Sequence, residues 1–304
     1  MNKIIVGSLI LILLVSGCSN LPFNIPFLSN SGTQVKELPS DVISIQNMTV
    51  LPSTSVRERD QFSVYFDLMN EDEFSKADSS YSIYDTGLCN WTGGDPNSKN
   101  GTIPLYPQEI KSVEWNFKAP SAEEIANLRV TCPIRFRFDF DYQAKSQIDI
   151  LVAKSDYLTQ LQRAGKSTTF SPTVNVGRGP IKIYFDFGTT LPARNNSDLT
   201  VYVRAEDKGS GMLNEIKAGN FTVTFPSEFD LSKVDCPYFD KCPGNKCTSN
   251  ADIPIISKKS LDIRCSGITT PDSSKFSDEK TYFINATLNY SYYVAGEVDV
   301  QVNP

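Results

Sequence analysis

The chain contains no histidine among its 304 residues. Histidine supplies the general base of Ser-His-Asp triads and of Cys-His pairs, because its charge changes near neutral pH. It is also a frequent ligand of zinc. The absence of histidine therefore excludes these two kinds of catalytic site and every metal centre that is built on imidazole ligands.

The sequence also lacks a net positive charge and a long apolar run. Its formal net charge is −6 at pH 7, whereas a protein that binds nucleic acid needs a basic footprint. The longest apolar run covers only residues 4–15, and a helix that crosses a bilayer needs roughly 20 apolar residues. We therefore expect neither a nucleic-acid partner nor a permanent transmembrane helix.

Residues 1–18 have the order of an export signal. Lys3 precedes the apolar run, and small residues end it. Val15-Ser16-Gly17-Cys18 resembles the lipobox of prokaryotic lipoproteins, which implies cleavage before Cys18 and attachment of lipid to its thiol. We expect a signal peptide over residues 1–17 and an extracytoplasmic protein that is anchored to the membrane through Cys18. The alternative is an ordinary secretory signal followed by a chance cysteine.

The rest of the chain predicts a tether followed by strands. Residues 18–40 are rich in Pro, Ser and Asn, and we interpret them as a flexible tether. From residue 41 onward apolar and polar residues alternate, for example over residues 62–69 and 134–142. Alternation with a period of two indicates strands with one buried face, as in an antiparallel sandwich.

The second half of the chain repeats the pattern of the first half. Ile43-Ser44-Ile45 recurs as Ile181-Lys182-Ile183, and Ser82-Ile83-Tyr84 recurs as Thr222-Val223-Thr224. The strand over residues 134–142 recurs over residues 284–292. Repetition on this scale predicts two copies of one sandwich. The predicted domains are residues 41–154, a linker with a possible short helix over residues 155–172, and residues 173–304 with a cysteine-rich insertion. The alternative is coincidental alternation in two unrelated all-β domains.

Two turns, Met69-Asn70-Glu71 and Asp207-Lys208-Gly209, follow alternating strands. With them, residues 41–304 resemble the tandem immunoglobulin-like modules of archaeal and bacterial surface proteins, and most of all the cell-adhesion-related domain found in bacteria. The resemblance implies an all-β fold of two tandem immunoglobulin-like antiparallel β-sandwiches. It also implies adhesion, scaffolding or assembly rather than catalysis.

Six cysteines remain when Cys18 is set aside, and an even number in an exported chain predicts disulfides. Cys89 and Cys132 are the only pair in the first predicted domain. The other four allow three pairings. Leu261, Ile263 and Cys265 share one strand face, which is expected to point inward and matches Val113, Trp115 and Phe117. An inward Cys265 is expected to pair with an inward Cys236, which leaves Cys242 with Cys247. The rival is a four-cysteine zinc site, but the spacings lack the usual two-residue knuckles. We therefore expect no metal and no cofactor.

Seven asparagines lie in Asn-x-Ser/Thr sequons and are candidate glycosylation sites, unless they are ordinary polar surface residues. They are Asn47, Asn90, Asn100, Asn195, Asn220, Asn285 and Asn289. Strand parity predicts that Asn220, Asn285 and Asn289 point outward. Trp91 is a candidate contact residue if its loop is exposed, because an exposed Trp is a good binding anchor. The alternative is that Trp91 packs over the disulfide of Cys89.

No group of residues predicts catalysis. Asp139 and Asp141 share a strand face with two arginines, as on a salt-bridged surface, and the acidic turn over residues 67–73 lacks the spacing of an EF-hand. The lysines are scattered, and we expect none to lie in an apolar run that would lower its pKa. The predicted function is binding, adhesion or assembly with another surface protein or a glycan. The alternative is a solute-binding lipoprotein that holds a ligand between its domains or on its loops.

Overall fold

The computed structural model describes residues 33–213 and 215–304. The predictions for the signal peptide, Cys18 and most of the tether lie outside the described residues. The described residues are mainly antiparallel strands, so the predicted all-β sandwich fold is confirmed. Their one α-helix is α2 (Ser155–Arg163), which ends before Gly165 as the linker pattern predicted. None of the described helices is long and apolar enough to span a membrane.

The first sandwich has a four-stranded antiparallel sheet on one side. Its order is β2 (Ile43–Leu51), β4 (Gln61–Asn70), β8 (Ile110–Lys118) and β6 (Asn90–Asp95). The inward face carries the alternate apolar residues of β4 and β8, which are buried while the residues between them are not. Alternate side chains of a strand point to opposite faces, so this sequence pattern places its apolar residues in the core and its polar residues toward solvent.

The second sandwich has a sheet of six strands on one side. Its members are β11 (Ile181–Phe187), β13 (Asp198–Asp207), β18 (Lys259–Ser260), β17 (Ile253–Ile256) and β14 (Glu215–Ile216), with β19 (Ile263–Thr269) paired to β13. Two short 3-10 helices, η1 (Pro243–Asn245) and η2 (Ser273–Lys275), lie in the connections.

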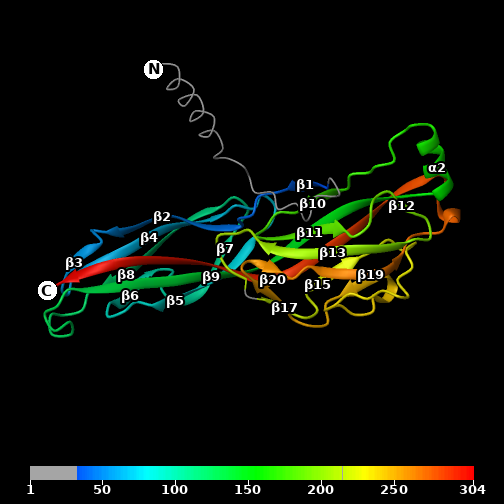
Figure 1. Ribbon diagram of the computed structural model, residues 1–304. Helices are drawn as coiled ribbons and strands as arrows, with labels where there is room; N and C mark the ends of the chain where they lie inside the picture. The colour runs from blue at the N-terminus through cyan, green and yellow to red at the C-terminus, as the bar shows by residue number, and fades with distance from the viewer. Residues whose placement is uncertain (1–32, 214) are drawn as a thin grey trace, which may run out of the picture. The chain divides into compact units, whose positions relative to one another are not determined.

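A ten-stranded sheet serves both sandwiches (Figure 1). Its main order is β1 (Gln34–Glu37), β10 (Thr173–Val176), β9 (Val130–Ala153), β20 (Glu279–Asn303), β15 (Phe221–Thr224) and β16 (Lys246–Thr248). Four strands add to it at the sides: β5 (Ala77–Asp85), β7 (Asn100–Leu105), β3 (Ser55–Arg57) and β12 (Ala193–Arg194).

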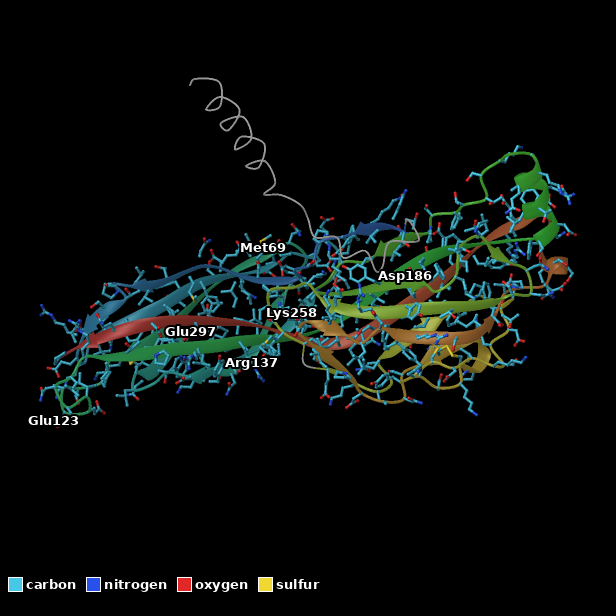
Figure 2. All side chains as sticks on the ribbon, viewed as in Figure 1. Met69, Glu123, Arg137, Asp186, Lys258 and Glu297 are labelled. Atoms are coloured by element: carbon cyan, nitrogen blue, oxygen red, sulfur yellow. A yellow bond between two sulfur atoms is a disulfide. The ribbon has the colours of Figure 1, made fainter. Side chains whose placement is uncertain are left out.

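The centre of this sheet is an antiparallel ribbon of the two long strands β9 and β20, which lie side by side in Figure 1. Their pairing runs without a break from Val130 opposite Val302 to Ala153 opposite Glu279. Arg137 and Glu297 project from its exposed face (Figure 2). We call this pair of strands the ribbon.

Each strand of the ribbon begins in one sandwich and ends in the other. The first half of β9 pairs with β5, whereas its last two residues pair with β12. The first half of β20 pairs with β15, whereas its end pairs with β3. The predicted domains 41–154 and 173–304 therefore share one sheet and exchange their final half-strands, and residues 33–304 form one compact unit.

The strand register supports the internal repeat that the sequence predicts. Ser82 lies opposite Arg137 in the first half, and its counterpart Thr222 lies opposite Thr287 in the second. The ends of β9 and β20 also correspond. The end of β9 pairs in parallel with β12 of the second half, and the end of β20 pairs in parallel with β3 of the first half. The two halves are thus copies of one strand arrangement around the middle of the ribbon.

One predicted correspondence is displaced by two residues. The sequence pattern matched Ile263 with Trp115, but the pairing of β13 with β19 places Cys265 opposite Val201, where the first half has Trp115 opposite Val64. Leu261, which was expected to point inward, is 47% exposed and precedes β19. The alternation alone could not distinguish the two registers, because a shift by two keeps every side chain on the same face.

Candidate functional site

A hollow of about 700 Å³ opens at the middle of the ribbon, where its strands pass from one sandwich to the other. We call it the junction hollow. Its lining residues are Ser75, Lys76, Asp141, Tyr142, Gln143, Lys145, Gly177, Arg178, Asn220, Asn289, Tyr290 and Ser291. These residues come from segments far apart in the sequence and from both halves of the chain. The hollow therefore exists only because the two halves share the ribbon.

The floor of the junction hollow carries paired polar side chains. Gln143 Nε2 donates a hydrogen bond to Asn289 Oδ1 at 2.8 Å across the ribbon. One step along, the Ser291 hydroxyl donates to the Asp141 carboxylate. Alternate residues of a strand project from the same face, so the register of the ribbon brings these groups together. The amides keep further donors and acceptors that can face a ligand.

The loop over residues 71–76 forms one wall of the hollow and is held by Asp72. Asp72 is only 2% exposed and accepts hydrogen bonds from the Tyr142 hydroxyl, from Phe74 N at 2.8 Å and from Ser75 N at 3.1 Å. Burial alone would raise the pKa of Asp72, but these hydrogen bonds and the charge of Arg178 hold it below its usual value. Both carboxylate oxygens of Asp72 therefore have hydrogen-bond partners within the protein.

Arg178 connects this wall to the second half of the chain. Its Nη1 donates to the carbonyl of Glu71 at 2.8 Å, and its Nη2 lies 3.2 Å from Glu73 Oε1. The Arg178 side chain is only 15% exposed, so the contact is partly shielded from solvent. The wall is therefore a fixed structure rather than a loose turn.

The opposite side of the ribbon midpoint has a related arrangement. The Tyr292 hydroxyl donates to Asp207 Oδ1 at 2.8 Å, and Gly209 N donates to the same oxygen at 3.0 Å. In the first half, Asp72 N donates to Asn70 Oδ1 at 3.0 Å. The two turns that carry the family resemblance therefore have the same side-chain-to-backbone hydrogen bond. Both turns flank the middle of the ribbon.

Phe74 is a candidate contact residue that the sequence analysis missed. It follows Glu73 in the fixed wall, next to Ser75 in the hollow, and is 84% exposed. Trp91, which the sequence suggested, is half-buried and packs against the core. Its indole N–H is buried without an acceptor among the described residues. Trp91 therefore lies in β6 and packs against the core rather than on an exposed loop, and Phe74 replaces it as the candidate contact residue.

The predicted glycosylation sites differ in their surroundings. Asn285 and Asn289 lie on the exposed face of β20, as the parity predicted. Asn220 and Asn289 line the junction hollow. Asn47 donates to Asp67 at 2.8 Å, and Asn195 accepts a hydrogen bond from Ser155 N at 3.0 Å. Asn90 and Asn100 are exposed. Glycosylation at these seven positions stays a prediction.

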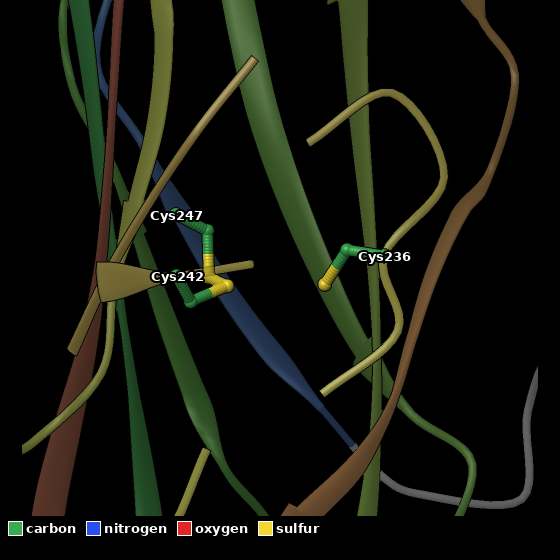
Figure 3. Close-up of side chains that lie close together, drawn as sticks. All are labelled: Cys236, Cys242 and Cys247. Carbon is green, nitrogen blue, oxygen red and sulfur yellow. A yellow bond between two sulfur atoms is a disulfide. The ribbon is translucent and has the colours of Figure 1, made fainter. Parts of the chain in front are cut away.

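The structure contains the disulfides Cys89–Cys132, Cys236–Cys265 and Cys242–Cys247. These are the pairs that position and strand parity favoured. The sulfurs of Cys236, Cys242 and Cys247 all lie within 4.8 Å of one another (Figure 3). The cysteine-rich insertion is therefore a compact cluster and not an extended loop.

Lys182 contradicts the expectation that no lysine has a lowered pKa. It lies between Ile181 and Ile183, is 0% exposed, and burial lowers its pKa to about 8. Its Nζ donates to the carbonyls of Leu38, Pro39 and Gly177, the last two at 3.0 and 2.9 Å. These three hydrogen bonds use the three N–H groups of the ammonium, so the group has a structural role.

The exposed acids of the ribbon match the surface that the sequence predicted. Arg137 Nε lies 3.0 Å from Asp139 Oδ2, and Asp141 accepts from Ser291. Both acids point away from the core. Neither acid is buried, whereas a catalytic pair of carboxylates needs one member in a desolvated environment.

No protein-family model matches the chain, and no curated protein matches it. Among solved structures, the cupredoxin domain of amoB from Nitrosocaldus yellowstonii aligns with 34% of this chain and 80% of its own, at 13% identity and a TM-score of 0.25. The VP2 subviral particle of infectious bursal disease virus aligns with 87% of this chain and 81% of its own, at 10% identity and a TM-score of 0.13. Scores this low carry no argument about function.

Proposed function

We propose that this protein is a lipid-anchored surface protein that binds its partner at the junction hollow and has no catalytic activity. The observation that carries the proposal is the hollow itself, which both halves of the chain line and whose wall includes the loop that carries the exposed Phe74. Sites of this kind combine a few placed polar groups with an aromatic contact. The lipobox-like sequence at Cys18 supports attachment to the outer face of a membrane.

The chemistry of the lining fits a partner rich in hydroxyl groups, such as a surface glycan. A sugar hydroxyl both donates and accepts hydrogen bonds, and the amides of Gln143, Asn220 and Asn289 offer both functions. Asp141 adds an acceptor and Lys145 adds a donor. The lining is therefore better matched to a saccharide than to an apolar peptide.

A free solute is the second candidate ligand. The observation that favours it is that two tyrosines, Tyr142 and Tyr290, line a hollow formed by both halves of the chain. A monosaccharide that binds as tightly as the corresponding oligosaccharide would support solute capture. Affinity that grows with chain length would instead support recognition of a surface polymer.

Binding should depend on the amide pair in the floor of the hollow. The double variant Gln143→Ala, Asn289→Ala should bind oligosaccharides about 10-fold more weakly or worse, because two hydrogen-bonding groups worth roughly 1 kcal/mol each are lost. The measurement is retention on an array of neutral, N-acetylated and uronic-acid oligosaccharides. Phe74→Ala should weaken the same interactions.

The ribbon offers a matched control for this experiment. Gln147 Nε2 donates to Asn285 Oδ1 at 2.9 Å in the same cross-strand arrangement, outside the junction hollow. The double variant Gln147→Ala, Asn285→Ala should therefore retain wild-type binding. Equal losses in both double variants, or no oligosaccharide binding by the wild type, would contradict the proposed site.

Cys18→Ser should release the protein from the membrane or block its processing, because the variant has no thiol to carry lipid. Lipid chains contribute about 0.8 kcal/mol per buried CH₂, and stable anchoring requires two or more chains. Fractionation of cells into membrane and soluble pools measures the effect. If the variant stays in the membrane and is processed like the wild type, Cys18 is not the anchor.

A further inference from the structure

Four cysteines from separate segments converge in the interior of the second sandwich. Cys236, Cys242, Cys247 and Cys265 are 5%, 4%, 0% and 0% exposed. The sulfurs of the first three lie within 4.8 Å of one another (Figure 3). The sulfur of Cys265 is bonded to that of Cys236. Three sulfurs of two different disulfides therefore lie in one small buried volume, and the fourth is bonded to one of them.

The backbone around the cluster is held by contacts other than the disulfides. Cys247 lies in β16, opposite Val223, and Cys265 lies in β19, opposite Val201. Asp240 Oδ1 accepts hydrogen bonds from Cys242 N and Thr248 N, both at 3.0 Å, which fixes the turn that carries Cys242. None of these contacts involves a sulfur–sulfur bond, so we expect them to hold the four side chains near one another when the disulfides are opened.

The spacing of the sulfurs is close to what a tetrahedral metal ion needs. Zinc binds thiolate sulfur at about 2.3 Å, which places the four sulfurs of a tetrahedral site roughly 3.8 Å apart. The sulfurs of Cys236, Cys242 and Cys247 lie within 4.8 Å of one another and reach this separation through side-chain shifts on the order of 1 Å. The sulfur of Cys265 starts from its bond to Cys236 and has to move apart from it. The site contains no open position for a substrate, so it matches a structural rather than a catalytic centre.

We propose that the reduced protein binds one soft divalent cation such as Zn²⁺ through Cys236, Cys242, Cys247 and Cys265. A trialkylphosphine and water convert each disulfide into two thiols, and the phosphine becomes its oxide. The cation then displaces four protons and is held by four thiolates. Because the same sulfurs form either the disulfides or the metal site, the two states exclude each other. The inference does not depend on the proposed binding function.

The test uses the full chain with Cys18→Ser, Cys89→Ser and Cys132→Ser, so that only the four clustered cysteines remain. After reduction with a trialkylphosphine, titration with Co²⁺ should reach one equivalent. It should give the visible bands of tetrahedral cobalt and the near-ultraviolet bands of thiolate coordination, and one equivalent of Zn²⁺ should remove both. The oxidised protein should bind neither metal. A further variant with Cys242→Ser and Cys247→Ser should lose at least 100-fold in affinity.

The same experiment includes a check that the reduced protein is folded. Near-ultraviolet circular dichroism should show native packing in the zinc-bound form, and 8 M urea should weaken Co²⁺ binding at least 100-fold. Equal affinity in urea would mean that an unfolded chain chelates the metal, which overturns the proposal. It is also overturned if the reduced chain binds less than one equivalent, or if zinc does not maintain or restore the native spectrum.

Discussion

Replacing Trp115 by alanine should lower the free energy of unfolding by about 3–5 kcal/mol, the usual cost of removing a fully buried large aromatic side chain. Trp115 is 0% exposed in the core of the first sandwich. Its ring centroid lies 4.9 Å from those of Phe66 and Phe136, both in edge-to-face geometry. The substitution removes these contacts and leaves a cavity that rigid strands cannot collapse to fill. Urea denaturation measures the loss.

The same loss should appear in the second sandwich, because the ribbon runs through both. Tryptophan fluorescence reports on the first half, which contains both tryptophans, and far-ultraviolet circular dichroism reports on all strands. The two signals should give one coincident transition in the wild type and in the variant. Two separate transitions would contradict the shared core. Tyr106→Ala, at a residue that is 60% exposed, is the control and should change stability by less than about 0.5 kcal/mol.

The strands and their buried faces could be predicted because the signal is local. Along β9 and β20 the buried positions alternate as the sequence pattern indicated, and the inward parity of Cys265 pointed to its partner. A period of two needs no knowledge of the neighbouring strand. The exchange of half-strands could not be predicted in this way. The end of β9 and the end of β20 both have an alternating apolar face, and such a face fits the core of either sandwich equally well.

The candidate site depended on information that the local pattern does not contain. The junction hollow combines residues as far apart as Ser75 and Ser291, and only the register of the ribbon brings them together. Phe74 did leave a signal, because it is an apolar residue within a polar turn. Lys182 also left one, since the sequence places it between two isoleucines. The sequence could not show that three backbone carbonyls surround the ammonium group of Lys182, because two of them belong to a segment more than 140 residues away.

Lys182→Met should abolish a rise in stability with pH that the wild type shows between about pH 8 and 10.5. Burial lowers the pKa of Lys182 to about 8 from its ordinary value of 10.5. The charge of Arg178 also lowers this pKa, whereas the charges of Glu37 and Asp41 raise it by less than burial lowers it. Between these two values the unfolded chain binds more protons than the folded chain, so raising the pH favours folding. One pKa unit corresponds to about 1.4 kcal/mol, which gives a rise of roughly 3 kcal/mol over the window.

Urea denaturation of both proteins at several pH values measures this effect. Tyrosine ionisation also changes stability at high pH, but it is common to both proteins and cancels in the difference between them. Lys36 is exposed in β1, so Lys36→Met should keep the rise that the wild type shows.

At pH 7 the Lys182→Met variant removes a buried charge but leaves the carbonyls of Leu38, Pro39 and Gly177 without their donor. The diagnostic quantity is therefore the change with pH. If the stability difference between wild type and Lys182→Met is the same at pH 8 and pH 10.5, Lys182 does not titrate in this window.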